Sequence, residues 1–155
     1  MRVVGVSSGR VSAPGFDLVL PRQSLCEAVA TGDFVIALVP YAPGTHHIID
    51  GPVFGAMKPS AFYINLARGN VTDEQALIAA LLEGRIAGAG LDVFATEPLP
   101  PDSPLWTMPN VIATPHIGGM SDVYVQQILP LLDFNIAAFR SGNLAGMRNL
   151  VELNR

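Results

Sequence analysis

The fold is decided by residues 61–94, AFYINLARGNVTDEQALIAALLEGRIAGAGLDVF. Two apolar runs, Ala61–Asn65 and Ala87–Phe94, each have the length of a buried strand. Between them, apolar residues at helical spacing predict a helix that begins at a capping-box pattern on Thr72 and stops at Gly84. A strand, a helix and a second strand in this order predict a βαβ unit, and therefore a parallel sheet.

The same alternation continues on both sides of this unit. Further apolar runs predict strands over Arg2–Ser7, Phe34–Val39 and Asn110–Ala113. Helical patterns predict a short helix over Ser24–Ala30 and a weak one over Thr45–Met57 that is broken near Gly51-Pro52. A long helix is predicted from a cap at Ser121 to Arg140. Pro130 should bend this helix, and Gly142 should end it. Strands joined by helices or long crossings predict an α/β fold with a Rossmann-like, doubly wound parallel sheet.

The predicted sheet is incomplete. A full dinucleotide-binding domain opens with a strand and Gly-x-Gly-x-x-Gly, which bind the pyrophosphate, and the sequence has no such segment. Gly88-Ala89-Gly90 has Val93 in place of the third glycine and no helix after it, so we interpret it as close packing inside a buried strand. In the complete fold the missing first strand is usually central. Its absence is therefore expected to separate Arg2–Ser7 and Phe34–Val39 from the three later strands and to expose unpaired backbone edges.

Composition narrows the functional class. The 155 residues are 50% hydrophobic, enough for one domain with a core. Mean hydropathy is +0.39, but no apolar run approaches the roughly 20 residues of a membrane helix, and Met1–Val6 lacks the features of a signal peptide. We therefore expect a cytoplasmic protein with no membrane segment. A net charge of −4 with 9 Lys and Arg argues against nucleic acid, which leaves small molecules or another subunit as partners.

Two residue types have simple structural interpretations. Cys26 is the single cysteine and cannot form an internal disulfide; beside Leu25 and Val29 in a helical pattern, it is predicted to be a buried structural thiol. His46 and His47 are adjacent and cannot share a helix face, and a metal site needs more ligands than the sequence offers near them. No metal site is predicted.

Three short motifs each place an ionisable side chain just after an apolar run. They are Asn65-Leu-Ala-Arg68-Gly69, Leu91-Asp92-Val93-Phe94-Ala-Thr-Glu97-Pro98 and Thr114-Pro115-His116-Ile-Gly118-Gly119. Arg68, Glu97 and His116 are therefore expected at the carboxyl edge of the sheet, where α/β enzymes hold their active sites. Taken singly, each residue has a structural alternative to a catalytic role. Arg68 could pair with a nearby carboxylate, Glu97 could be an ordinary loop carboxylate, and His116 could be a solvated loop histidine. Together they supply an acid-base group, a carboxylate that orients it and a fork of donors for an anion.

These motifs, in this order and spacing, resemble the D-isomer-specific 2-hydroxyacid dehydrogenases, from about Val3 to about Leu150. The resemblance implies an oxidoreductase that transfers hydride reversibly between NAD(P)H and a small 2-keto acid. It implies that Arg68 binds the carboxylate and carbonyl oxygen of the substrate. His116 would be the general acid in reduction and the base in oxidation, with Glu97 hydrogen-bonded to it. Formate dehydrogenases resemble this family but carry glutamine at the position of Glu97.

The same resemblance implies cofactor contacts. Asp92 corresponds to the aspartate that bonds the nicotinamide carboxamide, although a strand-end aspartate can instead cap a turn. The other positions are Gly118 and Gly119, which let backbone approach the ring, Ala67 beside the nicotinamide, and Pro40 and Thr45 over the adenosine side.

The end of the first strand bears on the choice of cofactor. NAD enzymes usually place an acidic residue there for the ribose hydroxyls, and this sequence has none. Ser7, Ser8 and Arg10 resemble the form found in relatives that use NADP, so they are predicted to bind a 2′-phosphate and to favour NADP over NAD. The alternative is that Arg10 is a solvated loop residue.

The resemblance also implies a domain organisation. Residues 1–141 correspond to a partial NAD(P)-binding domain, and residues 142–155 to a C-terminal tail that in the family returns toward the substrate domain. The family pairs through this domain, so a homodimer is expected. One alternative stays open at this point: a non-catalytic truncated remnant, or an oligomerising domain that lacks cofactor binding because the glycine loop is absent.

Overall fold

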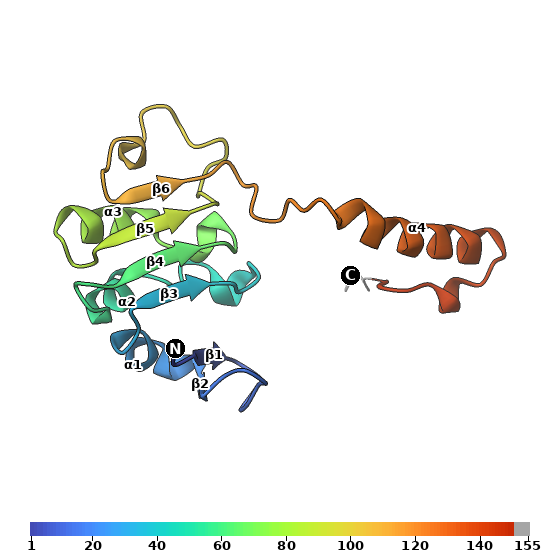
Figure 1. The fold of residues 1–155 in the computed structure, drawn as a ribbon, viewed down its shortest axis with the longest axis horizontal. Helices are drawn as coiled ribbons and strands as arrows, with labels where there is room; N and C mark the ends of the chain where they lie inside the picture. Colours follow the sequence, from blue (N-terminus) through green and yellow to red (C-terminus); the bar gives the residue numbers. More distant parts are fainter. Residues whose placement is uncertain (151–155) are drawn as a thin grey trace. The chain divides into compact units, whose positions relative to one another are not determined.

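The computed structural model describes residues 1–150, and its contacts divide the chain into two units, Met1–Gly118 and a second that begins at Gly119. The first unit is the α/β part of the chain (Figure 1). Its elements are β1 (Val4–Ser7), β2 (Leu18–Pro21), α1 (Leu25–Ala30), β3 (Phe34–Ala37), α2 (Gly51–Ala56), β4 (Phe62–Asn65), α3 (Glu74–Leu82), β5 (Gly88–Leu91) and β6 (Val111–Ala113).

All strand pairs of the first unit are parallel, which confirms the predicted sheet type. Four strands form one sheet in the order β3-β4-β5-β6, and β1 and β2 form a second, two-stranded sheet. The predicted break in the sheet is present, but its predicted position was wrong. Phe34–Ala37 pairs with Phe62–Asn65, so the break lies between β2 and β3.

The strand β2 accounts for this difference. It was not predicted, because four residues ending in Pro21 carry little periodicity. Asp17 fixes its start, since its carboxylate accepts a bond from the N–H of Val3 at 2.6 Å and its own N–H donates to the carbonyl of Val3 at 2.9 Å. The first strand therefore pairs with β2 rather than with β3.

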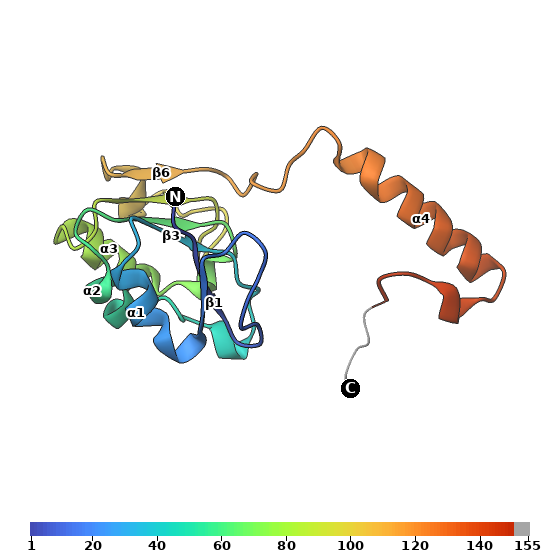
Figure 2. The same cartoon turned by 60° about the horizontal axis from the view of Figure 1, so that its bottom comes forward.

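Three helices cover one face of the four-stranded sheet. Figure 2 shows α1, α2 and α3 on the same side of it, and the largest buried side chains lie in this layer, among them Phe54, Tyr63 and Leu77. Burying such a side chain contributes about 1.5 to 3 kcal/mol. Gly88 of β5 is directed to the other face of the sheet, toward Phe62, and has no space for a side chain, because a Cβ would lie 2.6 Å from the carbonyl oxygen of Asn110. The interpretation of this glycine as close packing is confirmed.

The helix ends differ in part from the prediction. Asp73, not Thr72, caps α3, because its carboxylate accepts a bond from the N–H of Ala76 at 3.1 Å. Gly84 follows the helix with a φ of 67°, a conformation that favours glycine. The predicted end of the helix at Gly84 is confirmed. The weak segment predicted over 45–57 is helical only in its second half, where Asp50 caps α2.

Cys26 lies on α1 as predicted but is exposed, so the prediction of a buried thiol was wrong. The buried residues of this short helix are Ala28 and Val29. A six-residue helix has fewer than two turns from which to predict the buried face.

The second unit contains one long helix, α4 (Tyr124–Arg140), with Pro130 inside it and Gly142 just beyond its end. Ser121 precedes the helix instead of capping it, since its hydroxyl accepts a bond from the N–H of Val123. The predicted division into residues 1–141 and 142–155 stays a prediction, and residues 151–155 of that tail lie outside the described residues. Within residues 1–150, no helix is both long and apolar enough to cross a membrane.

Candidate active site

The turn that carries Arg68 is fixed by a buried asparagine at the end of β4. The side-chain oxygen of Asn65 accepts a bond from the N–H of Ala67 at 3.0 Å, and its amide donates to the carbonyl of Arg68 at 3.2 Å and to the hydroxyl of Thr72 at 3.1 Å. The guanidinium of Arg68 is exposed and donates one bond to the carbonyl of Ala67 at 2.6 Å. Its other N–H donors make no hydrogen bond to a residue of the described range 1–150, so they can serve a ligand.

Gly69 brings this turn against the loop that carries Glu97. A Cβ at Gly69 would lie 1.8 Å from the carbonyl oxygen of Phe94 and 2.4 Å from the N–H of Ala95. Because both neighbours are backbone, no side-chain movement relieves such a contact. The close approach of two backbone segments is thus what sets Arg68 beside the Glu97 loop.

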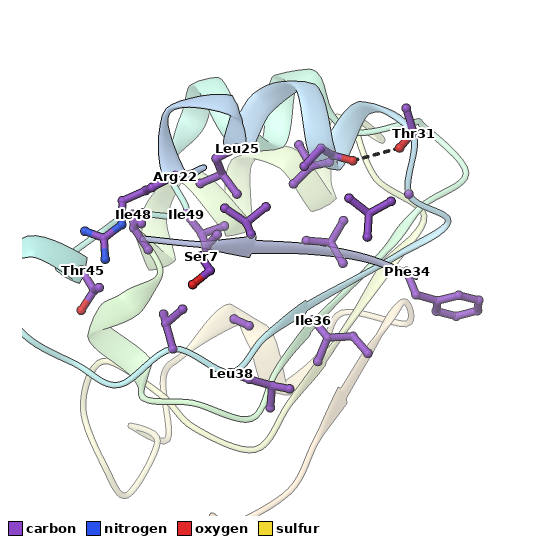
Figure 3. A pocket seen from close by; sticks show the side chains of 18 of the residues that line it. Ser7, Arg22, Leu25, Thr31, Phe34, Ile36, Leu38, Thr45, Ile48 and Ile49 are labelled. Atoms are coloured by element: carbon purple, nitrogen blue, oxygen red, sulfur yellow. Dashed lines mark hydrogen bonds between the residues drawn. The ribbon is translucent and has the colours of Figure 1, made fainter. Parts of the chain in front are cut away.

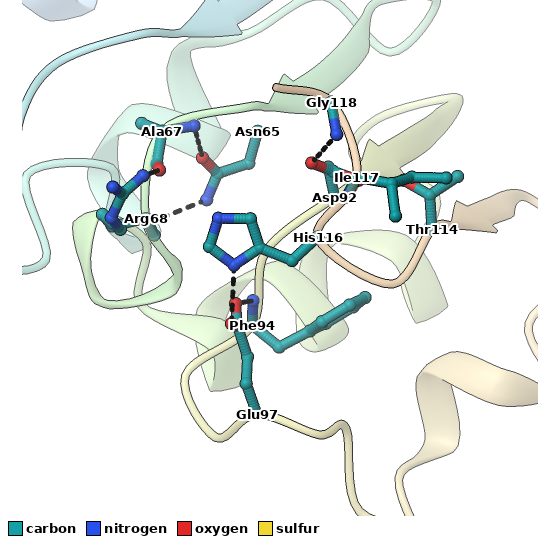
Figure 4. Close-up of polar contacts among 10 residues, drawn as sticks. All are labelled: Asn65, Ala67, Arg68, Asp92, Phe94, Glu97, Thr114, His116, Ile117 and Gly118. Atoms are coloured by element: carbon teal, nitrogen blue, oxygen red, sulfur yellow. Dashed lines mark hydrogen bonds and ion pairs between the residues drawn. The ribbon is translucent and has the colours of Figure 1, made fainter. Parts of the chain in front are cut away.

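Glu97 bridges its own loop to His116. One carboxylate oxygen accepts a bond from the N–H of Phe94 at 2.9 Å, and the other lies 2.7 Å from Nδ1 of His116. Figure 4 shows the opposite edge of the imidazole turned toward the Arg68 turn. Bonding at Nδ1 fixes the ring and leaves Nε2 as the nitrogen that can exchange a proton with a ligand.

The charge state of Glu97 follows from these contacts. Burial raises the pKa of Glu97, but the hydrogen bonds from His116 and from the N–H of Phe94, together with the charges of His116 and Arg68, lower it below its usual range. Glu97 is therefore ionised near neutral pH and is an acceptor for the N–H of His116.

Asp92 holds the loop on which His116 lies. Its buried carboxylate accepts bonds from the hydroxyl of Thr114 and from the N–H groups of Ile117 at 2.9 Å and Gly118 at 2.7 Å. Burial raises the pKa of Asp92, but these three hydrogen bonds and the charge of His116 lower it overall. His116 itself has a φ of 55°, which is uncommon for a residue with a side chain and persists only where the surrounding contacts impose it.

An open cavity of about 760 Å³ lies at the carboxyl ends of β3, β4 and β5, and we call it the Arg68 cavity. It is lined from the Arg68 turn, from the Glu97 loop and from the end of β3, where Pro40 and Tyr41 lie. An anion placed in it can meet the guanidinium of Arg68. Glu97 lines the same cavity and contacts His116, which is not itself one of the lining residues.

A second cavity of about 650 Å³ lies between β1 and β3, and we call it the β1–β3 cavity (Figure 3). Ser7, Ser8, Pro40 and Thr45 line it, and Pro40 also lines the Arg68 cavity. The two cavities therefore adjoin at the end of β3, an arrangement that fits an extended dinucleotide. Thr45 is buried, and its hydroxyl is used inside its own loop, donating to the carbonyl of Pro40 at 2.7 Å.

The structure thus gathers most of the predicted site residues, though not all in one place. Arg68, Glu97 and Ala67 share one cavity, and Asp92 and Gly118 are hydrogen-bonded to each other beside it. Gly119 belongs to the second unit, and Arg10 is exposed and lines neither cavity.

Sequence reasoning missed the residues that position this set. Asn65 and Gly69 lie inside the motif that contains Arg68, and Thr114 lies inside the motif that contains His116. Asn65 at the end of a strand and Gly69 after an arginine are the sequence signals for this role. They indicate it only when the position of the neighbouring loop is known.

The comparisons with known proteins identify the family of the chain. A family model described as "D-isomer specific 2-hydroxyacid dehydrogenase, NAD binding domain" matches residues 1–118. The chain belongs to this family. The resemblance inferred from the three motifs is thereby confirmed.

Relatives of this 2-hydroxyacid dehydrogenase chain are similar in both sequence and structure. Glyoxylate/hydroxypyruvate reductase B of Escherichia fergusonii is 47% identical over 112 residues, which cover 72% of this chain and 35% of that protein. A D-isomer specific 2-hydroxyacid dehydrogenase family protein from Aeromonas salmonicida gives a TM-score of 0.83 at 38% identity, covering 94% of this chain and 47% of that one.

A third relative was solved with a cofactor. The NADPH-dependent glyoxylate/hydroxypyruvate reductase of Sinorhizobium meliloti, in complex with NADP and sulfate, gives a TM-score of 0.83 at 31% identity and covers 97% of this chain and 48% of that one. The chain spans 35% of the length of the Escherichia relative.

Proposed function

We propose that this chain supplies the proton-transfer and anion-binding residues of an enzyme that reduces small 2-keto acids, such as glyoxylate or hydroxypyruvate, to 2-hydroxy acids with NAD(P)H. The observation that carries the proposal is the 2.7 Å contact between Glu97 and His116 at the loop beside the Arg68 cavity. A non-catalytic remnant has no need of an ordered carboxylate–imidazole pair next to a free guanidinium, so the geometry favours the enzyme.

Arg68 is the proposed anchor for the substrate. A guanidinium binds a carboxylate with two parallel bonds. Arg68 donates one bond to the carbonyl of Ala67, and its other donors have no partner in the part of the chain that the structure describes. A 2-keto acid held in this way places its keto oxygen near the same positive charge. The charge that develops on that oxygen during reduction is then stabilised.

His116 is the proposed proton donor. Glu97 occupies Nδ1, so the proton that completes the new hydroxyl group leaves from Nε2 and the imidazole becomes neutral. In the oxidative direction Nε2 takes the hydroxyl proton, and the ionised Glu97 stabilises the imidazolium that forms. Glu97 acts through the imidazole and is a positioning residue.

The residues present fit a nicotinamide cofactor, which would supply the hydride to the keto carbon when bound. An ionised carboxylate has about four acceptor positions, and Asp92 uses three for donors of the His116 loop, so one remains for a carboxamide. Pro40 and Ala67 line the Arg68 cavity, where the ring would lie, while Ser7, Ser8 and Thr45 line the β1–β3 cavity, where the adenosine would lie. The missing acidic residue at the end of β1 supports NADP over NAD.

Turnover of the purified chain tests this function. We expect consumption of NADPH with glyoxylate or hydroxypyruvate, and a loss of roughly 100- to 10,000-fold in kcat for His116→Ala. His46→Gln, at an exposed histidine that lines neither cavity, is the matched control and should retain most of the wild-type rate. A wild-type rate equal to that of His116→Ala with every 2-keto acid tested contradicts the proposal.

The predicted homodimer is also a proposal. It is supported by an apolar stripe along α4, where Val125, Leu129, Leu132 and Ile136 are exposed at helical spacing. A second copy of the chain can cover such a stripe. Light scattering tests this, and a mass equal to that of one chain across the accessible concentrations contradicts it.

A further inference from the structure

Glu74 joins α3 to the Glu97 loop. It is the first residue of the helix, and its carboxylate oxygen Oε2 accepts a bond from the N–H of Ala95 at 3.1 Å, 21 residues further along the chain. Among residues 1–150 Glu74 makes no ion pair, and this is the one hydrogen bond of its side chain. The half-buried carboxylate is therefore used to hold the backbone of a neighbouring loop.

The helix end that carries Glu74 is firmly anchored. The preceding residue, Asp73, caps the helix, and its N–H donates to the carbonyl of Ile49 at 2.9 Å. Leu77 and Leu81, about one and two turns further on, are buried in the core. A side chain on a packed helix starts from a fixed position, so it can hold a loop that has no regular structure of its own.

The peptide bond between Phe94 and Ala95 is held by both neighbouring segments. The N–H of Ala95 donates to Glu74, and the N–H of Phe94 donates to Glu97 at 2.9 Å, so two consecutive N–H groups each bind a carboxylate. The backbone of Gly69 packs against the same peptide bond, where a Cβ would lie 1.8 Å from the carbonyl oxygen of Phe94. The peptide is thus fixed by a side chain of α3 and by the Arg68 turn.

We propose that Glu74 is a positioning residue for proton transfer, because it holds the peptide from which Glu97 is directed at His116. This inference rests on the proposed function. One oxygen of Glu97 is bonded to the N–H of Phe94 and the other lies 2.7 Å from Nδ1 of His116 (Figure 4). Movement of Ala95 away from Glu74 displaces the adjoining Phe94 N–H, and the carboxylate then turns relative to the imidazole. Glu74 lines neither cavity, so it acts through the loop.

The alternative role of Glu74 is to stabilise α3, because a negative charge in the first turn of a helix interacts favourably with the helix dipole. Two variants separate these roles. Glu74→Asp keeps the charge but is one methylene shorter, so it should no longer reach Ala95. Glu74→Gln loses the charge but keeps the length and an acceptor oxygen for the same N–H. Positioning predicts a defect in the Asp variant, and helix stabilisation predicts one in the Gln variant.

The first measurement is kcat for reduction of a 2-keto acid by NADPH. Glu74→Asp should lower kcat about 2- to 10-fold, the effect of one net hydrogen bond, and Glu74→Gln should stay within about 2-fold of wild type. Glu83→Asp is the matched control and should keep the wild-type rate, since Glu83 follows the other end of α3, pairs with Arg85 and lines neither cavity. A larger loss in Glu74→Gln than in Glu74→Asp overturns the proposal.

The same substitution in a Glu97→Ala background gives a readout that a loss of stability does not produce. If Glu74 acts through Glu97, adding Glu74→Asp to Glu97→Ala should leave kcat unchanged. A helix that is merely less stable lowers the folded fraction by the same factor in both backgrounds. An equal fall of kcat in both backgrounds overturns the proposal.

Nuclear magnetic resonance tests the same contact without turnover. The chain has three histidines, so the ring signals of His116 can be identified by comparison with His116→Ala. These signals and the amide signal of Ala95 should shift in Glu74→Asp and stay in place in Glu83→Asp. Unchanged His116 signals in Glu74→Asp, or equal shifts in Glu83→Asp, overturn the proposal.

The two measurements separate this inference from the proposed function. A chain in which Glu74→Asp shifts the His116 signals, but which reduces no 2-keto acid, contradicts only the proposed function. A chain that reduces 2-keto acids equally well with and without Glu74→Asp contradicts only the role of Glu74.

Discussion

The carboxylate of Asp92 and the backbone of Gly118 are in mutual contact, with the N–H of Gly118 donating to Oδ2 of Asp92 at 2.7 Å. A Cβ at Gly118 would lie 2.8 Å from the same oxygen, so this approach depends on glycine. His116 lies two residues before Gly118 in the loop that this contact closes. The imidazole is therefore positioned from β5 through Asp92, and from the neighbouring loop through Glu97.

Asp92→Asn should lower stability and change its pH dependence. The pKa of Asp92 is lowered in the folded chain, so its contribution is present above the ordinary value of 3.8 and is lost as the pH falls through the folded value. Asn keeps one acceptor but turns a donor toward a backbone N–H, at a cost on the order of 2 kcal/mol. Urea unfolding near neutral pH should show this loss, and below pH 3.8 the variant should lose less stability than wild type. Parallel pH profiles for both proteins would count against this account.

Gly69→Ala should prevent the site from assembling. The added methyl would meet the backbone of Phe94, and a contact of this kind is expected to cost about 4 kcal/mol or more. Gly55→Ala is the matched control, because α2 leaves open space around Gly55. That helical change should be neutral or stabilising by up to about 1 kcal/mol. Thermal unfolding compares the two variants, and equal stability would show that the Arg68 turn does not pack as described.

Asn65→Ala should loosen the Arg68 turn. The variant loses three hydrogen bonds, each worth about 1 kcal/mol, that join β4 to the turn and to Thr72. We expect a higher KM for the 2-keto acid, because the guanidinium is less well fixed, with a smaller change in kcat. Asn110→Ala removes one hydrogen bond of 3.4 Å elsewhere in the sheet and should leave KM unchanged. An unchanged KM in Asn65→Ala would show that Asn65 does not position Arg68.

Much of the fold and the site could be predicted because both depend on local patterns. Apolar runs followed by polar motifs place Arg68, Glu97 and His116 at strand ends, and the parallel sheet brings those ends to one edge. The strand β2, the cap at Asp73 and the exposure of Cys26 could not be predicted in this way. They belong to elements of four to nine residues, which carry little periodicity, and they depend on tertiary contacts.

Long-range contacts were also beyond the reach of the sequence. Nothing near Arg22 indicates that Gly44 will fix its guanidinium, and nothing near Asp92 indicates that three donors from the His116 loop will satisfy its carboxylate. Such pairs are separated by more than twenty residues, and only the folded sheet brings them together.

The central claim is that Glu97 and His116 act as one proton-transferring unit beside Arg68, and a double-mutant cycle tests it most directly. The measurement is kcat for reduction of a 2-keto acid by NADPH in wild type, Glu97→Gln, His116→Ala and the double variant. If Glu97 acts only through His116, the double variant should be no slower than His116→Ala alone. Effects of the two single substitutions that multiply in the double variant, or a wild-type rate no greater than that of His116→Ala, would contradict the account.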